Sequence, residues 1–159
     1  MAIYRKKQII EALQGIVEIS EPQLAYYLKL GIVTPDVANP SGRAETKYHS
    51  AENLVDIVIA RELEDAGLSL KAIKGVMDSV RKEVRNEYKQ LKDSYRLQII
   101  VANPNLPGSW AKLQKCLKKN LQRIKNPVDP GKVALDMDAA KSYTVIDITT
   151  TIQKMAHLL

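Results

Sequence analysis

One short segment contains three side chains that are suited to contacting DNA: Gln23, Tyr26 and Lys29. In a helix, Tyr26 and Lys29 lie on the side opposite Leu24, and Gln23 lies at its margin. A glutamine amide can bond bidentately to adenine in the major groove, and a lysine can reach guanine or phosphate there. A tyrosine hydroxyl can donate to a phosphate oxygen, which fixes register without reading sequence. These residue types therefore predict a helix that enters the major groove.

Four neighbouring residues complete the set of candidate DNA contacts. Tyr27 lies on the apolar side of the same helix, where a core position is the alternative to a contact. Arg43 and Lys47 belong to a stretch rich in glycine and proline. They would reach flanking phosphates or the minor groove, unless they are ordinary solvated charges. Tyr48 comes directly after Lys47, and the basic run at residues 5–7 can either touch phosphate or begin an exposed helix.

The sequence contains none of the common catalytic patterns: there is no GxGxxG, no P-loop and no HExxH. Its one cysteine, Cys116, and its two histidines, His49 and His157, are isolated from one another, whereas transition-metal sites need several such ligands together. Cys116 has Leu113 and Leu117 nearby and is interpreted as a small buried hydrophobe. A reactive thiol or an intermolecular bridge is the alternative. We therefore predict a protein that is not an enzyme and that uses no metal or cofactor.

Helix-capping signals predict the elements that hold the candidate contacts. Residues 5–13 carry apolar side chains at helical spacing and form a first helix. Ser20 begins a second helix, because Gln23 three positions later completes a capping box and a proline stands in the first turn. Gly31 ends this helix after Leu30, in the left-handed conformation that glycine adopts easily.

Turn-forming residues and further caps predict the elements that come after the second helix. Residues 32–48 contain proline, asparagine and glycine between short extended flanks, which is typical of a β-hairpin. Ser50 caps a third helix, which Gly67 ends, and Ser69 caps a fourth. Two helices, a hairpin and two further helices in this order indicate a winged helix-turn-helix.

Three stretches of this region resemble the winged-helix DNA-binding domain of MerR-type transcriptional regulators. LAYYLKLGIVTP at residues 24–35 is similar to the family's Leu-Arg-Tyr-Tyr-Glu stretch, which leads to Gly-Leu and Pro. KYHSAENL at residues 47–54 is similar to its basic-Tyr-Ser segment. LEDAGLSLKAIKGVM at residues 63–77 is similar to its Leu-x-x-x-Gly-Phe-Ser-Leu-x-x-Ile pattern. The resemblance runs from about Tyr4 to Val80.

The resemblance implies a function and a set of partners. MerR-type regulators bind near-palindromic promoters as dimers, often activate by distorting promoter DNA, and in many cases respond to an effector. A sequence-specific transcriptional regulator is therefore implied, with double-stranded DNA, a second copy, a small-molecule effector and RNA polymerase as partners. The chain departs from the family at Ala25, which replaces the arginine before the tyrosine pair, and at SGRAET, which replaces the Gly-Tyr-Arg wing sequence.

A narrow apolar stripe marks the middle of the chain. Its members are four, four, three and four residues apart: Val80, Val84, Tyr88, Leu91 and Tyr95. Such a stripe predicts a long helix over residues 78–96 that pairs with the same helix of a second copy in a coiled coil. The alternative is a helix that packs onto its own domain.

The remaining sequence predicts a small α/β domain over residues 97–159. A loop at residues 103–108 precedes an amphipathic helix from Ser109 to about Ile124. KVALDM and YTVIDI then form a hairpin, and residues 149–158 form a closing helix. The aromatic residues of this region either line a pocket for an apolar ligand or form its core: Tyr95, Trp110 and Tyr143.

We thus expect a mainly α chain in three parts. Residues 1–77 form the winged helix-turn-helix DNA-binding domain, residues 78–96 the dimerisation helix, and residues 97–159 a domain that binds an effector or supports the dimer. No run of about 18 apolar residues is present and the N-terminus lacks a signal peptide, so we expect no membrane segment and a cytoplasmic location.

The distribution of charge supports a different class of function as the alternative. The net charge is +6, but residues 1–80 hold 9 Lys/Arg and 11 Asp/Glu, a net of −2. Residues 81–125 hold 12 Lys/Arg and 3 Asp/Glu, a net of +9. Such a basic region can bind RNA or an acidic protein, which would make the chain an adaptor. Solvated helices with apolar inner sides are the other interpretation of these charges.

Overall fold

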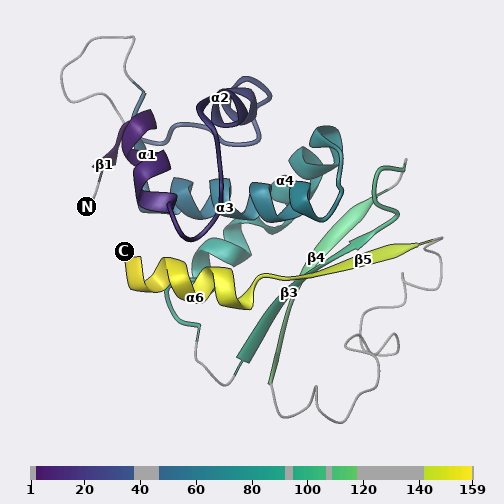
Figure 1. The fold of residues 1–159 in the computed structure, drawn as a ribbon. Helices are drawn as coiled ribbons and strands as arrows, with labels where there is room; N and C mark the ends of the chain where they lie inside the picture. The colour runs from purple at the N-terminus through teal and green to yellow at the C-terminus, as the bar shows by residue number, and fades with distance from the viewer. Residues whose placement is uncertain (1–2, 38–46, 92–94, 107–108, 118–141, 159) are drawn as a thin grey trace.

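The computed structural model describes residues 3–37, 47–91, 95–106, 109–117 and 142–158. The helices are α1 (Lys6–Leu13), α2 (Glu21–Lys29), α3 (Ala51–Asp65), α4 (Leu70–Glu87) and α6 (Thr149–Leu158). The strands are β1 (Ile3–Tyr4), β2 (His49–Ser50), β3 (Tyr95–Ala102), β4 (Trp110–Leu117) and β5 (Tyr143–Asp147). Helices α1 to α4 gather on one side of a three-stranded sheet, and α6 returns from that sheet toward α3 (Figure 1).

The structure confirms the predicted beginning and end of α2. Gln23 N donates to Ser20 Oγ at 3.3 Å, and Gln23 Oε1 accepts from Ser20 N at 3.0 Å, which completes the capping box. Gly31 comes after the helix with φ of +68°, a left-handed conformation in which a residue with a Cβ is strained. Ser50 and Ser69 accept backbone N–H groups in the same way at the beginnings of α3 and α4, as predicted.

The base of the predicted hairpin joins the N-terminal helices to α3. Val37 and Tyr48 form an antiparallel bridge, and β1 pairs antiparallel with β2. Asp36 accepts from both the backbone N–H and the hydroxyl of Ser50, at 2.9 and 2.6 Å. These bonds fix the base to the beginning of α3. The tip of the hairpin, at residues 38–46, lies outside the described residues.

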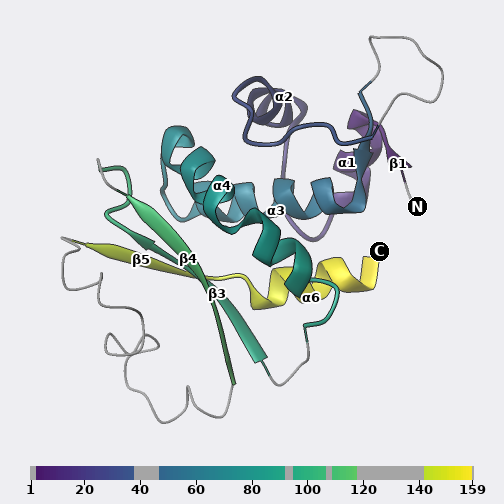
Figure 2. The same cartoon turned by 180° about the vertical axis from the view of Figure 1, so that it is seen from behind.

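The C-terminal sheet is antiparallel, with the strand order β4–β3–β5. Leu97, Ile99 and Val101 of β3 are fully buried on the face that α4 and α6 cover (Figure 2). Ile100, on the opposite face, is also fully buried. This central strand is missing from the sequence-based expectation, although a short continuous apolar run is typical of a strand buried on both faces.

The prediction of a long helix over residues 78–96 is wrong. Helix α4 ends at Glu87, and the chain then turns and enters β3. Val80, Val84 and Tyr88 are buried in the chain's own core, where α4 packs against β4 and α3. The apolar stripe is therefore used within one chain, as in the alternative of a helix that packs onto its own domain, and it is not available to a second copy.

The prediction of a helix from Ser109 to Ile124 is also wrong, because residues 110–117 form strand β4. The spacing of Trp110, Leu113 and Leu117 fits a helix, but so short a pattern does not separate a helix from a strand. Pairing decides between them: each residue of β4 lies opposite a residue of β3. The remainder of the predicted helix lies outside the described residues.

Two other C-terminal predictions are confirmed. YTVIDI contains strand β5, and the closing helix is α6. KVALDM, the predicted hairpin partner, lies outside the described residues, and β5 pairs with β3. Thr151 of α6 donates to Glu62 of α3 at 2.6 Å, and buried side chains from Ile9 to Met155 form one cluster. The division of the chain at residues 77 and 96 stays a prediction. No helix in the described ranges is long and apolar enough to span a membrane.

Asp56 of α3 joins this helix to α4 through buried charges. Its side chain is 3% exposed, with Arg85 Nη2 at 2.5 Å and Arg81 Nε at 3.2 Å from Oδ2. Burial raises the pKa of Asp56, and the hydrogen bond and positive charge of Arg85 oppose that rise. Removing one member of such a group leaves the others desolvated and uncompensated, so the group anchors α4 on α3.

We expect Asp56→Ala to lower the free energy of unfolding by about 3 kcal/mol or more, because the partly buried guanidinium groups of Arg81 and Arg85 lose their anionic partner. Urea unfolding followed by circular dichroism measures this loss. The matched control is Lys74→Gln, which removes the exposed ion pair with Asp78 and should change stability by less than about 0.5 kcal/mol. Equally small losses in both variants would contradict the anchoring role.

Candidate nucleic-acid interface

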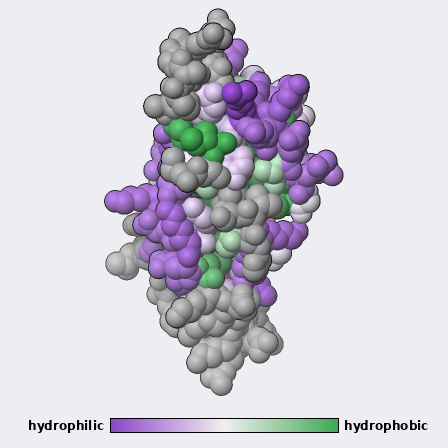
Figure 3. Space-filling model, turned by 90° about the vertical axis from the view of Figure 1, so that its left-hand side faces the viewer, coloured by the Kyte–Doolittle hydropathy of each residue, from purple (hydrophilic) through white to green (hydrophobic). Residues whose placement is uncertain are grey.

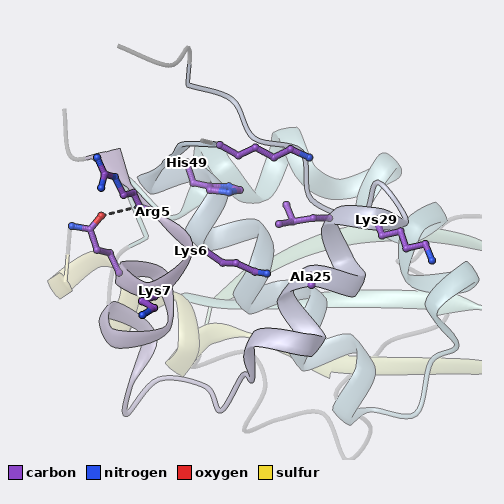
Figure 4. Close-up of a pocket in the computed structure, with 9 residues that line it drawn as sticks. Arg5, Lys6, Lys7, Ala25, Lys29 and His49 are labelled. Atoms are coloured by element: carbon purple, nitrogen blue, oxygen red, sulfur yellow. Dashed lines mark hydrogen bonds between the residues drawn. The ribbon is translucent and has the colours of Figure 1, made fainter. Parts of the chain in front are cut away.

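Basic residues from three elements line a groove of about 880 Å³ between α1, α2 and the segment that enters β2 (Figure 4). The groove is lined by Arg5, Lys6, Lys7, Gln8, Ala25, Leu28, Lys29, Lys47 and His49. Five of these nine residues are lysine or arginine, and none carries a carboxylate. A groove with this lining attracts anions, and the phosphates of a nucleic-acid strand are such anions.

Three cations at the beginning of α1 oppose the dipole of that helix. Arg5 is the N-cap residue, Lys6 and Lys7 come next, and the first turn holds no acidic residue. The positive end of the helix dipole lies here, so these charges destabilise α1. An anion bound in front of the helix would be attracted by both the ammonium groups and the free N–H groups. These three cations therefore lower the stability of α1 but favour the binding of an anion at its beginning.

Arg5 also fixes the beginning of α1 against the hairpin base. Its backbone N donates to Gln8 Oε1 at 2.8 Å, as the dashed line in Figure 4 marks. Its Nη2 donates to the Tyr48 hydroxyl at 3.3 Å, and its guanidinium lies 5.6 Å from the centre of that ring. Tyr48, predicted as a DNA contact, is 7% exposed. Its observed role is therefore to hold Arg5 beside the groove.

In the described part of the N-terminal region no acidic residue lines the groove, and several acidic side chains form ion pairs elsewhere. Glu52 and Asp56 pair with cations of α4, and Glu64 pairs with Arg61 at 3.2 Å. The net charge of −2 over residues 1–80 therefore conceals a segregation of the two signs. On the side of the molecule that carries β1 and α1, most of the described surface is hydrophilic, and a small hydrophobic area lies in its upper part (Figure 3).

The outer residues of α2 divide between the groove and a second hollow. Lys29 is exposed and lines the groove. Tyr26 is 50% exposed and borders a separate apolar hollow of about 250 Å³, together with Pro22 and Leu70. Gln23 is half-buried, and its Oε1 is occupied by the capping box. A bidentate bond to adenine needs both the oxygen and the nitrogen of the amide, so Gln23 cannot make that bond while the cap is closed.

Tyr27 belongs to the core, not to an outer surface of α2. Its side chain is 1% exposed, and its hydroxyl donates to the Glu64 carboxylate. Burial, and then the bond to Glu64, raise the pKa of Tyr27 well above its ordinary value, so the hydroxyl stays protonated. The alternative of a core position is therefore the observed one, and the interpretation of Tyr27 as a DNA contact is corrected.

The groove brings together two of the predicted contacts, Lys29 and Lys47. Arg43 lies outside the described residues. Ala25 and His49 also line the groove, although their residue types gave no signal of DNA contact. The basic run at residues 5–7 was identified from the sequence as a possible phosphate contact, and these residues do line the groove. In the described part of the chain no group of three or more His, Cys, Asp or Glu residues is placed to hold a metal ion.

The comparisons with known proteins identify the N-terminal region. Residues 10–80 match the model of a family described as MerR HTH family regulatory protein. This range contains α2 and α3, the second half of α1 and the first part of α4. A search of curated proteins found no match to the chain.

Tyr27→Phe tests whether Tyr27 is a core residue. We expect it to lower the free energy of unfolding by about 1 kcal/mol at neutral pH, since Glu64 loses a donor. The folded-state pKa is raised above the ordinary 10.0, so this contribution is full below about pH 10 and is lost as pH rises further. Urea unfolding at neutral and alkaline pH measures both effects. Tyr26→Phe is the exposed control, and DNA affinity reduced by Tyr27→Phe in a stably folded chain would contradict the core role.

Lys29→Gln combined with Lys47→Gln tests the groove as a phosphate site. We expect duplex DNA to bind more weakly and the slope of log K against log salt to fall by about 2, because two phosphate contacts are lost. Fluorescence anisotropy across a salt series measures the slope. The control is Lys82→Gln, which removes an exposed cation of α4. A larger effect of the control than of the double variant would refute the assignment.

Proposed function

We propose that the protein is a transcription regulator that binds a specific duplex DNA sequence, because residues 10–80 match the model of the MerR HTH family of regulatory proteins. One observation carries this proposal beyond the family. Five cations from α1, α2 and the segment entering β2 line a single groove beside α2, with no carboxylate among the lining residues. Phosphate contacts supply much of the affinity of any DNA-binding protein, and a helix supplies the reading of bases.

In the proposed complex, α2 lies in the major groove and the basic groove runs along one DNA strand. Lys29 and Lys47 bind phosphates, together with the cations at the beginning of α1. Tyr26, which is half exposed, donates its hydroxyl to a further phosphate. Arg43, which lies outside the described residues, is a further candidate for a contact with the flanking DNA. The resulting role is one of binding, without catalysis.

We further propose that two copies bind a near-palindromic promoter site, as dimeric helix-turn-helix proteins commonly do. The stripe formed by Val80, Val84 and Tyr88 is buried within one chain, so the two copies would associate through a different surface. Bound at a promoter in the cytoplasm, the protein would act on RNA polymerase. A small apolar effector would bind the C-terminal sheet, where Trp110 and Tyr143 both lie opposite Ala102.

The alternative, an RNA- or protein-binding adaptor that uses residues 81–125, has less support from the described residues. Five of the seven cations that the structure describes in this range form ion pairs with carboxylates: Arg81, Arg85, Lys89, Arg96 and Lys115. Ion-paired cations contribute less to the field that attracts a polyanion. The groove beside α2 has no such internal neutralisation among its lining residues.

Selection from a pool of random duplexes by the full chain tests the proposed function. We expect a near-palindromic sequence that binds at least about a thousandfold more tightly than random duplex at physiological salt. Lys29→Ala with Lys47→Ala should abolish this binding. The proposal would be contradicted if the chain bound duplexes without sequence preference, if Lys29→Ala with Lys47→Ala left that binding unchanged, and if Lys118→Ala with Lys119→Ala abolished it. That result would favour the adaptor.

A further inference from the structure

His49 forms part of the wall of the basic groove and is the one histidine among the lining residues. It lies in β2, opposite Tyr4 of β1, and is 1% exposed. Its ring extends from β2 toward the space between α1 and α2 (Figure 4). The DNA-binding role proposed above does not yet use this residue.

One hydrogen bond determines which ring nitrogen carries the proton. His49 Nδ1 lies 2.7 Å from Asn53 Oδ1, in the first turn of α3. A carbonyl oxygen only accepts, so Nδ1 must be the donor and the neutral ring has its lone pair on Nε2. The two nitrogens of an imidazole point in divergent directions. Because Nδ1 points to α3, Nε2 is turned away from Asn53, and the described residues provide it with no hydrogen-bond partner.

The groove lining around this ring is mainly cationic, and the carboxylate of Asp36 accepts from the backbone N–H of the next residue, Ser50. Its surroundings include the cations Arg5, Lys6 and Lys7 from α1, Lys29 from α2, and the neighbouring Lys47. The groups packed against it from β1 and α3, Tyr4 and Asn53, are neutral near pH 7. An imidazolium would be repelled by the cations of an empty groove, whereas a bound phosphate would attract it.

We propose that the groove holds a backbone phosphate of duplex DNA against His49 and that binding takes up one proton at Nε2. Ala25 borders the same space with only a methyl group, which leaves room for the phosphate beside α2. The proton comes from the solvent and is taken up by the Nε2 lone pair. The new N–H then donates to a phosphate oxygen while Nδ1–H keeps its bond to Asn53. This inference rests on the proposed DNA-binding function and adds a linkage to pH.

The linkage predicts how affinity varies with pH. The phosphodiester and the lysine and arginine side chains keep their charges between about pH 5.5 and 8, whereas histidine changes charge in this range. Affinity should therefore rise as pH falls, by up to about tenfold per unit, over the interval in which only the bound form is protonated. This dependence should be greatest at low salt, where phosphate contacts are strongest.

Binding of a random-sequence duplex of about 30 base pairs to the full chain, at fixed low salt and varied pH, tests the inference. Wild type should show the rise in affinity, and His49→Gln should bind with a flat profile because its amide does not titrate. The matched control is His157→Gln, which changes the chain's second histidine and should keep the wild-type profile. Calorimetry on wild type measures the binding enthalpy in two buffers of different ionisation enthalpy. The difference between the two enthalpies should correspond to the uptake of up to one proton per bound chain.

Three other results would overturn the inference in distinguishable ways. Binding with a flat profile and no buffer-dependent heat would refute proton uptake and leave the DNA-binding function standing. A wild-type profile in His49→Gln, or its loss in His157→Gln, would refute the assignment to His49. Failure of the wild-type chain to bind any duplex would overturn both proposals. If His49→Gln does not fold, the buffer comparison on wild type and His157→Gln decides the matter.

Discussion

The buried carboxylate of Asp56 is the constraint on which the rest of the structure depends. It lies between α3 and α4, with Arg81 and Arg85 of α4 directed at it, so α4 can occupy only one position on α3. In that position the apolar side of α4 faces strand β4 and is covered by the sheet. The same interaction therefore joins the N-terminal helices to the C-terminal sheet and keeps the apolar stripe of α4 buried within one chain.

This constraint also determines where free positive charge remains. The cations of α4 neutralise carboxylates of α3, whereas the cations that line the groove between α1 and α2 have no carboxylate beside them in that lining. Net charge alone suggests that the C-terminal half of the chain binds nucleic acid. The ion pairs of the described residues instead favour the groove in the N-terminal half. The N-terminal half, with a net charge of −2, thus offers the surface that suits a polyanion.

The sequence predicted the elements whose signals are local. Ser20 and Gly31 bound a helix because capping and left-handed conformation depend on neighbouring residues. Strands β3 and β4 were missed because short apolar runs do not separate a strand from a helix, and because β5, the second partner of β3, is remote in sequence. The residues of the candidate site likewise fall into those that local sequence predicts and those that it does not. Lys29 and Lys47 were predicted from residue type, whereas His49 meets the cations of α1 only because β1 pairs with β2.

Amide hydrogen exchange of the full chain, with and without the duplex recovered by selection, tests the central claim most directly. It locates the bound surface without changing a residue. Binding at the groove predicts new protection at the beginning of α1, along α2 and at residues 47–49, with little change in β3 and β4. Protection concentrated in residues 81–117, with α1 and α2 unchanged, would contradict the account and assign nucleic-acid binding to the basic region.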